Sequence, residues 1–450
     1  MRASADVQRR ARGIRAGVRG EDAGYVAMAT VTTEPAIERS KAVLEGLFGP
    51  QLGNEVAVRL WDGSEIPASS PAFTLLVNAP YALRAAFTPP LDANPGRAFV
   101  EGWIDIVGDV ELALDTLERS VTRLSKLALA RLAMLLARLP RAPRHHHGRA
   151  RLHGKVHSKA RDAAAIGFHY DQPVAFYRTF LGRELVYSCA YWDDGVTDLD
   201  GAQRAKLDYV LDKVRLRAGQ TFLDIGCGWG GLVLRAAQRG ARALGVTLSR
   251  RQHEEAQRRI AEAGLEDRAR VELRDYRELG DLQFDAIASV GMVEHVGRER
   301  LGEYFRCAYR ALREGGLFLN HGIVQQGRDG KGYRASDDFI GRYVFPDGDL
   351  VPVDVTTRAA ESVGFEVRDV ENLREHYART LRAWGTNLEA NRVTAIDATD
   401  ARTERIWRIY MAGSARGFAL GRMGLMQTLL GKPRSNGVTD VPPTRRDLYR

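Results

Sequence analysis

The segment Leu223-Asp224-Ile225-Gly226-Cys227-Gly228-Trp229-Gly230-Gly231 decides the fold of this chain. It follows an apolar, strand-like run and opens a run with helical spacing. Glycine is needed in such a turn because the backbone bends tightly and a ligand must approach bare main chain. Amide groups at the amino end of the following helix attract acceptor groups. The segment therefore predicts a ligand-binding turn between a strand and a helix.

Two kinds of ligand fit the glycine spacing. Gly226, Gly228 and Gly231 satisfy the GxGxxG pattern of nicotinamide-dependent dehydrogenases, which expects an acidic residue about 20 residues later to hold the ribose. The next strand instead ends in residues 245–249 (GVTLS), without an acid. The acid stands two residues before the first glycine, at Asp224, and DxGxGxG is the usual first motif of methyltransferases that use S-adenosylmethionine (SAM). We therefore predict SAM as the cofactor.

Apolar runs that predict strands alternate with helical runs around this turn. Strands are expected at 221–227, 241–249, 269–275, 284–291, 315–323 and 365–373, with helices ending near 239, 263 and 313, and residues 374–431 are expected to be helical. Such alternation predicts βαβ units and an α/β fold with a doubly wound, mostly parallel, Rossmann-like sheet.

The remaining sequence predicts a second, smaller unit. A chain of 450 residues is too long for one ordinary core. We expect disorder at 1–20, an amino-terminal α+β domain associated with lipid or membrane at 21–140, a basic linker at 141–160 and the catalytic domain at 161–450. Within the smaller domain, strands are expected at 56–61, 73–77 and 98–107, followed by one helix at 109–139.

Charge is concentrated in the amino-terminal third. Residues 1–161 hold 23 Lys and Arg against 16 Asp and Glu, and residues 119–161 hold 12 basic residues and no acidic one. Such a segment binds phosphate, on lipid or on nucleic acid. No apolar run approaches the roughly 18 residues that span a bilayer. We therefore expect a cytoplasmic protein that associates peripherally with the anionic inner face of the membrane. Three cysteines without a CxxC pair fit a reducing compartment.

Several motifs then resemble one family. They are YSCAYW (187–192), AKL (205–207), LDIGCGWGG (223–231), GVTLS (245–249), SVGMVEHVG (289–297) and YVFPDG (343–348). In this order they resemble the cyclopropane-fatty-acyl-phospholipid synthases, which include the mycolic-acid cyclopropane synthases. The resemblance covers about residues 160–430, and the chain length resembles the phospholipid-acting branch. It implies a phospholipid with unsaturated acyl chains as substrate and a homodimer by analogy.

The resemblance also implies a reaction and its residues. SAM gives its methyl group to the cis double bond of an acyl chain, a carbocation develops, and a bound bicarbonate removes a proton so that the cyclopropane ring closes. The bicarbonate pocket corresponds here to Cys189, Glu294, His321, Ile323 and Tyr410, with Tyr377 as a competitor for the tyrosine position. Glu294 or His321 could itself be the base.

A cofactor-binding set follows from the motifs and from the rule that ligands bind beyond the carboxyl ends of the strands. It comprises Tyr187, Ser188, Asp224, Gly226, Gly228, Gly230, Thr247, Ser249, Gln252, Asp275, Tyr276 and Arg277. No metal site is expected, because the run His145-His146-His147 has no other ligand cluster near it in the sequence.

Three alternatives remain open. An enzyme of the same fold would make a methylene- or methyl-branched chain, and no residue separates these products from the cyclopropane. A nucleic-acid methyltransferase would use residues 119–161 to bind phosphates, but the prolyl-cysteine motif of one such class is absent. A membrane-binding module without catalysis would not bind SAM. We therefore expect an enzyme, a SAM-dependent carbon methyltransferase, without a nucleic-acid partner.

Overall fold

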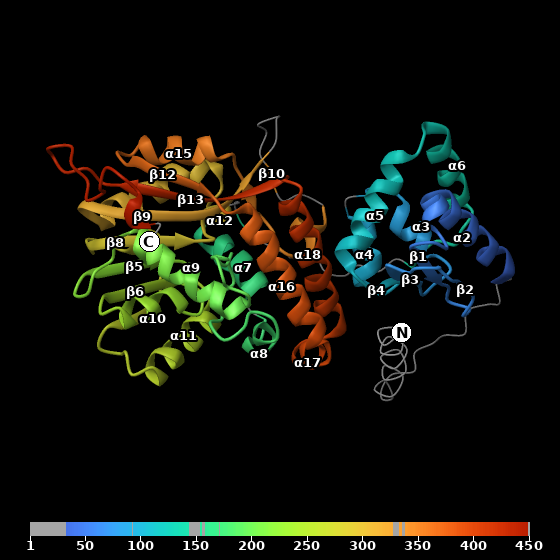
Figure 1. The fold of residues 1–450 in the computed structure, drawn as a ribbon, viewed down its shortest axis with the longest axis horizontal. Helices are drawn as coiled ribbons and strands as arrows, with labels where there is room; N and C mark the ends of the chain where they lie inside the picture. The colour runs from blue at the N-terminus through green and yellow to red at the C-terminus, as the bar shows by residue number, and fades with distance from the viewer. Residues whose placement is uncertain are drawn as a thin grey trace.

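The chain folds into two units, each built on its own β-sheet (Figure 1). The computed structural model describes residues 33–91, 93–143, 154, 158–170, 172–326, 333–334 and 338–448. The segment expected to be disordered, residues 1–20, lies outside these ranges. So do most residues of the expected linker, 141–160, including the three histidines at 145–147.

The larger unit contains a seven-stranded sheet in the order β12-β13-β9-β8-β5-β6-β7. Its strands are β5 (Thr221–Ile225), β6 (Arg242–Thr247), β7 (Ala269–Leu273), β8 (Phe284–Val290), β9 (Leu312–Gln325), β12 (Glu366–Asn372) and β13 (Met423–Gly431). The five neighbouring strands β7, β6, β5, β8 and β9 pair in parallel, whereas β13 is antiparallel to both of its neighbours, β9 and β12. This confirms the doubly wound, mostly parallel sheet. The strand order reverses at β5, so the crevice for a ligand lies beyond the carboxyl end of that strand.

Helices surround this sheet. They are α7 (Lys159–Tyr170), α8 (Val174–Arg178), α9 (Leu199–Lys213), α10 (Gly231–Gln238), α11 (Arg250–Glu262), α12 (Val293–Val296), α13 (Leu301–Ala311), α14 (Phe339–Tyr343), α15 (Val353–Glu361), α16 (Arg374–Ala390), α17 (Arg392–Ala398) and α18 (Ala401–Ala419). A short pair, β10 (Tyr333–Arg334) and β11 (Asp349–Leu350), forms a separate ribbon. Figure 1 shows α16 and α18 between the large sheet and the amino-terminal unit.

The helical expectation for residues 374–431 is wrong at its end. Residues 423–431 form strand β13, inserted between β12 and β9. Most of this strand is buried on both faces. A strand covered on both sides carries a continuous apolar run without alternation, and such a run cannot be distinguished from a buried helix by periodicity alone.

The amino-terminal unit packs helices on a four-stranded sheet of order β2-β1-β3-β4. Its elements are α2 (Thr33–Phe48), β1 (Val56–Arg59), β2 (Glu65–Ile66), β3 (Phe73–Val77), α3 (Ala82–Phe87), α4 (Asn94–Val100), β4 (Ile104–Gly108), α5 (Val110–Arg123) and α6 (Lys126–Ala137). Of the strand expected at 98–107, residues 98–100 belong to α4 and only residues 104–107 belong to β4.

The single helix expected at 109–139 is also wrong, because the chain breaks between α5 and α6. Leu124 and Ser125 adopt extended backbone angles, and the Ser125 hydroxyl accepts a hydrogen bond from the Ala128 amide at 3.2 Å. A serine in this position caps a new helix. The leucine spacing continued across the break and concealed it.

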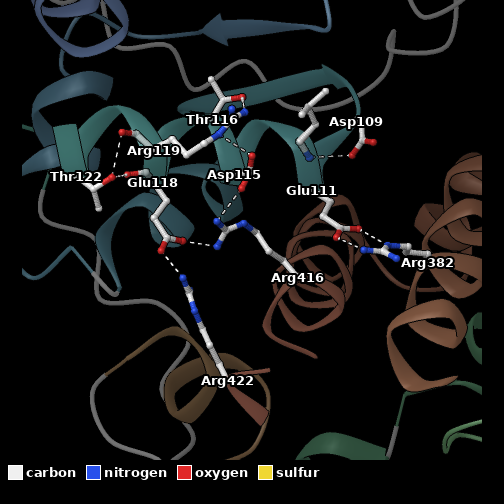
Figure 2. A network of polar contacts seen from close by, with 11 residues as sticks. Asp109, Glu111, Asp115, Thr116, Glu118, Arg119, Thr122, Arg382, Arg416 and Arg422 are labelled. Atoms are coloured by element: carbon white, nitrogen blue, oxygen red, sulfur yellow. Dashed lines mark hydrogen bonds and ion pairs between the residues drawn. The ribbon is translucent and has the colours of Figure 1, made fainter. Parts of the chain in front are cut away.

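Acidic residues of α5 meet arginines of the larger unit (Figure 2). Glu111 pairs with Arg382 of α16 at 2.7 Å. Glu118 pairs with Arg416 of α18 and with Arg422 after it. Glu111 and Glu118 are spaced two helical turns apart and so lie on one face of α5. The two units therefore meet through complementary charge. Among the described residues, no helix is long and apolar enough to cross a membrane.

Candidate functional site

A cavity of about 420 Å³ lies at the carboxyl ends of β5, β6 and β8. It brings together all five residues expected to form the bicarbonate pocket, Cys189, Glu294, His321, Ile323 and Tyr410. From the expected cofactor-binding set it is lined by Tyr187, Ser188, Asp224, Gly226, Gly228, Thr247, Gln252 and Tyr276. The other members of that set, Gly230, Ser249, Asp275 and Arg277, are not among the lining residues.

The glycine turn has the geometry that its sequence requires. Gly226 has φ +81°, and a Cβ atom there would lie 2.3 Å from Cγ of Met292. The amides of Gly226 and Cys227 both donate to the carbonyl oxygen of Val246, at 2.9 and 3.0 Å. Gly230 precedes α10 with φ +79°. The amides of Gly226 and Cys227 hold the turn against β6, so only the remaining main-chain groups of the turn can contact a ligand.

Asp224 is a buried acid that lines this cavity and has one unpaired carboxyl oxygen. Its side chain is buried, and Oδ1 has no hydrogen-bond partner. Burial raises the pKa of Asp224 to about 7, and the nearby Lys206 opposes this rise. A buried carboxyl without a partner is costly, so a cationic ligand group is favoured beside it. The amino group of SAM, the expected cofactor, would meet this requirement.

The next strand supplies short polar groups. The Thr247 hydroxyl donates to Oε1 of Gln252 at 2.8 Å, and both residues line the cavity. The Ser249 hydroxyl instead accepts from the Gln252 amide at 3.3 Å and caps α11. Ser249 therefore orients the helix that carries Gln252.

The residues after β7 divide into two groups. Tyr276 lines the cavity, whereas Asp275 and Arg277 form an ion pair at 2.6 Å. Arg277 also reaches Asp162 of α7 at 3.1 Å. This pairing fixes the start of the turn that carries Tyr276. A direct contact of Asp275 or Arg277 with the cofactor stays a prediction.

Glu294 and His321 are two buried polar residues that line the cavity. Oε1 of Glu294 accepts a hydrogen bond from the Ile323 amide at 2.6 Å, whereas Oε2 has no partner. Burial raises the pKa of Glu294 to about 7. The amide of Ile323 is thus occupied by Glu294. The carboxyl group has one oxygen available to a ligand.

The protonation state of His321 follows from its neighbours. Nε2 of Gln427, on β13, lies 3.2 Å from Nδ1 of His321. An amide nitrogen can only donate, so Nδ1 accepts and the proton of the neutral ring is on Nε2. Nε2 is buried and has no partner. Burial lowers the pKa of His321 to about 3, so the ring is neutral near pH 7 and offers one N–H donor.

Strand β9 continues past His321 to Gln325, two residues beyond the end at 323 that the sequence predicted, so the histidine lies within the strand. His321 pairs in register with Val290, the last residue of β8. This register brings it level with the other strand ends and with Glu294, which follows β8 on α12.

Aromatic hydroxyls and a thiol complete the pocket. The Tyr187 hydroxyl lies 3.4 Å from the Tyr410 hydroxyl, and burial raises the pKa of Tyr410 to about 12. Tyr377, the competitor for the tyrosine position, also lines the cavity. Burial raises the pKa of the Cys189 thiol, which keeps it protonated. A protonated thiol is a poor nucleophile, so Cys189 contributes its position in the pocket wall.

Among the polar residues that sequence reasoning missed, two bear directly on the predicted site residues. Gln427 orients His321 from β13, and Lys206 of α9 lines the cavity beside Ser188. Gln427 lies in the segment that was expected to be helical. Lys206 belongs to the AKL motif at 205–207, and its place in that motif was the only sequence feature that could have marked it as a site residue.

Comparison with known proteins gives consistent results. Residues 157–428 match the family model described as mycolic acid cyclopropane synthetase. A "probable fatty acid methyltransferase" of Pseudomonas putida is 40% identical over 87% of this chain and 96% of its own length. The "probable fatty acid methyltransferase Rv3720" of Mycobacterium tuberculosis is 36% identical over 85% and 92%. The crystal structure of mycolic acid cyclopropane synthase CmaA1 complexed with SAH and CTAB aligns with TM-score 0.56 and 32% identity, over 60% of this chain and 97% of that one.

Proposed function

This chain belongs to the mycolic acid cyclopropane synthetase family, and on that premise we propose that it transfers a one-carbon unit from SAM to the cis double bond of an unsaturated acyl chain in a phospholipid, leaving a cyclopropane ring. Its larger unit is a class I SAM-dependent methyltransferase domain, as the sequence predicted. The product and the phospholipid acceptor are the parts that we propose.

One observation carries this proposal. A single cavity is lined by Asp224 at the glycine turn and by Glu294 and His321, each of which has a buried polar atom without a partner. Much of the remaining lining is apolar, and it includes Ile323, Phe345, Phe418, Met423 and Leu425. A hydrocarbon chain gains free energy by leaving water for such a surface. The cavity therefore suits a sulfonium donor, an acyl chain and a proton acceptor side by side.

When bound, SAM supplies an electrophilic methyl group. Many residues of the cavity wall are buried, so an acyl chain seated against them would displace water. Tyr170, Tyr187 and Tyr377 line the cavity. The face of an aromatic ring beside a positive charge on the acyl chain would stabilise that charge by about 0.5–2 kcal/mol. Proton loss must follow before water adds to the cation.

The residues present fit a bicarbonate ion as the proton acceptor. Oε2 of Glu294 would accept from its hydroxyl, and Nε2–H of His321 and the Tyr410 hydroxyl would donate to its oxygens. Burial keeps His321 neutral, so it serves as a donor. Glu294 alone is the alternative base, since its pKa lies near 7.

The amino-terminal unit offers a surface for the membrane that carries the substrate. Leu127, Arg131 and Met134 follow one another at helical spacing on α6, and Leu127 and Met134 are 62% and 57% exposed. Lys126 begins the same helix. Because residues 119–161 contain no acid, this face suits an anionic phospholipid surface, with apolar side chains entering the headgroup region.

Branched products are the second candidate. The two relatives described above are named fatty acid methyltransferases, which fits a methylene- or methyl-branched chain as well as a cyclopropane. Their names also favour a lipid acceptor over nucleic acid.

The test is mass spectrometry of phospholipids after expression in a host that lacks such an enzyme. We expect unsaturated chains to gain the mass of one CH₂ group, and ozonolysis to leave the product intact because a cyclopropane has no double bond. A gain of CH₂ with cleavage by ozone would indicate a methylene branch, and a gain of CH₄ a methyl branch. Unchanged lipids would contradict the proposal.

A further inference from the structure

Lys206 is a buried cation that the protein leaves largely unsatisfied. It lies on α9, its side chain is 2% exposed, and it lines the cavity. Within the described part of the chain, its ammonium group makes one hydrogen bond, with the Ser188 hydroxyl at 3.0 Å, and no ion pair. An ammonium has three N–H donors. A buried charge with one neutral partner is costly unless a ligand supplies the counter-charge.

The same helix shows how this fold satisfies a buried lysine when no ligand is involved. Lys213 follows Lys206 by two helical turns and is 0% exposed. Its ammonium contacts Oε2 of Glu371, lies 3.6 Å from Asp369 and stands over the Tyr209 ring. Lys213 is therefore neutralised by β12. Lys206 faces the cavity instead.

The opposite charge lies in the same cavity but is not paired with Lys206. Asp224 is 3% exposed and its Oδ1 atom has no partner. Burial lowers the pKa of Lys206 to about 8 and raises that of Asp224 to about 7, and each opposes the shift of the other. The cavity thus presents one buried cation and one buried carboxyl group beside the glycine turn. This matches the two charges of an α-amino acid.

We propose that Lys206 binds the carboxylate at the methionine end of SAM, while Asp224 takes the adjacent ammonium group. The inference rests on the proposed use of SAM and adds a residue that determines which sulfonium is accepted. The carboxylate supplies the counter-charge that the described residues do not give to Lys206. A sulfonium without this carboxylate leaves Lys206 buried and unpaired.

The competing explanation is structural. Lys206 and Gln203 both reach the loop before α9, since Gln203 donates to the carbonyl oxygens of Val186 and Ser188 at 3.2 and 2.9 Å. Lys206 could then only hold the loop that carries Tyr187. A loosened loop would weaken the binding of SAM and of decarboxylated SAM to the same extent. Comparison of two ligands that differ only in the carboxylate separates the two roles.

The experiment measures the affinity of the full chain for SAM and for decarboxylated SAM by titration calorimetry. Wild type should bind SAM about 10- to 100-fold more tightly than decarboxylated SAM, as expected for a charge-assisted hydrogen bond. In Lys206→Met, the affinity for SAM should fall by about that factor, whereas the affinity for decarboxylated SAM should change little. The ratio of the two affinities should therefore approach one. Lys206→Arg should retain most of the preference. Lys41→Met, on α2 of the other unit, is the charge-matched control and should behave as wild type.

Two outcomes would overturn the assignment while the proposed function stands. In the first, wild type binds SAM and decarboxylated SAM with equal affinity, which can be measured without a variant. In the second, Lys206→Met weakens the binding of both ligands by the same factor. Failure of wild type to bind SAM at all would instead overturn the proposed function.

Discussion

Glu294 uses one carboxyl oxygen for the protein and has the other available to a ligand. Its Oε1 atom fixes the side chain through the Ile323 amide, and Oε2 is buried without a partner. His321 is arranged in the same way, with Nδ1 held by Gln427 and Nε2 unpartnered. Each side chain is thus oriented by one hydrogen bond, which leaves one polar atom of each to act on a ligand.

Glu294→Gln should keep SAM affinity but lower turnover by about 100-fold or more, because the amide is neither the same acceptor nor a base. Since burial raises the pKa of Glu294 to about 7, the carboxyl ionises as the pH rises through that value. Wild-type turnover at saturating SAM should therefore rise across pH 7, and the profile of the variant should lack this step.

The matched control is Glu303→Gln, a half-exposed residue of α13 paired with Arg300, which should keep the wild-type profile. Wild-type turnover in Glu294→Gln would contradict the role of this carboxylate.

The sequence identified part of the site because those residues follow strands, whereas Cys189, His321 and Tyr410 came from the family resemblance. Asp224, Thr247 and Glu294 come directly at or after the ends of β5, β6 and β8, and parallel strands bring those ends to one edge. Lys206 and Gln427 were not predicted. Gln427 reaches the site from β13, far away in the sequence, whereas Lys206 lies in the middle of α9, where no strand end or glycine turn marks it.

At the scale of elements, charge complementarity joins α5 to α18. Arg416 has a side chain only 11% exposed, and its acidic partners are Asp115, at 2.9 Å, and Glu118. The Arg416 guanidinium holds the pKa of Asp115 below its usual range. Arg422, the other partner of Glu118, lines the cavity, so this contact reaches the active-site wall (Figure 2).

Replacing both acids, Asp115→Asn with Glu118→Gln, leaves Arg416 without these partners. Because the acids are themselves about one-third exposed, we expect a loss of only about 1–2 kcal/mol and a thermal midpoint a few degrees lower. The deficit should shrink at high salt, which screens the pair. Glu266→Gln, an exposed residue of the larger unit, is the control. An unchanged midpoint in the double variant at low salt would show that the contact adds no stability.

Element boundaries show what the sequence could and could not predict. The strands around the glycine turn were predicted within a few residues, because each is an apolar run bounded by turn residues. The break at Ser125 and the strand β13 were missed. In both places the apolar spacing fits two conformations, and packing against a distant partner selects one of them.

At the scale of the whole molecule, catalysis and membrane contact are assigned to different units. The cationic face of α6 lies on the amino-terminal unit, whereas the cavity belongs to the larger one. A variant with Lys126→Gln, Leu127→Gln and Arg131→Gln should bind anionic vesicles at least about 10-fold more weakly, since each cation near the surface contributes about 1 kcal/mol. Its SAM affinity should match wild type.

Vesicle sedimentation measures the binding, with the pair Arg250→Gln and Arg251→Gln on α11 of the other unit as a charge-matched control. Equal vesicle binding by the α6 variant and wild type would remove α6 from the membrane contact.

The central claim is that a carbon passes from SAM to an acyl double bond within the cavity and then loses a proton. Its most direct test incubates the purified full chain with SAM carrying a trideuterated methyl group and with vesicles of an unsaturated, anionic phospholipid. Mass spectrometry of the recovered chains should show a gain of one CD₂ group, because ring closure removes one deuteron. A chain that keeps all three deuterons, or an unmodified chain in a preparation that binds SAM, would contradict the account.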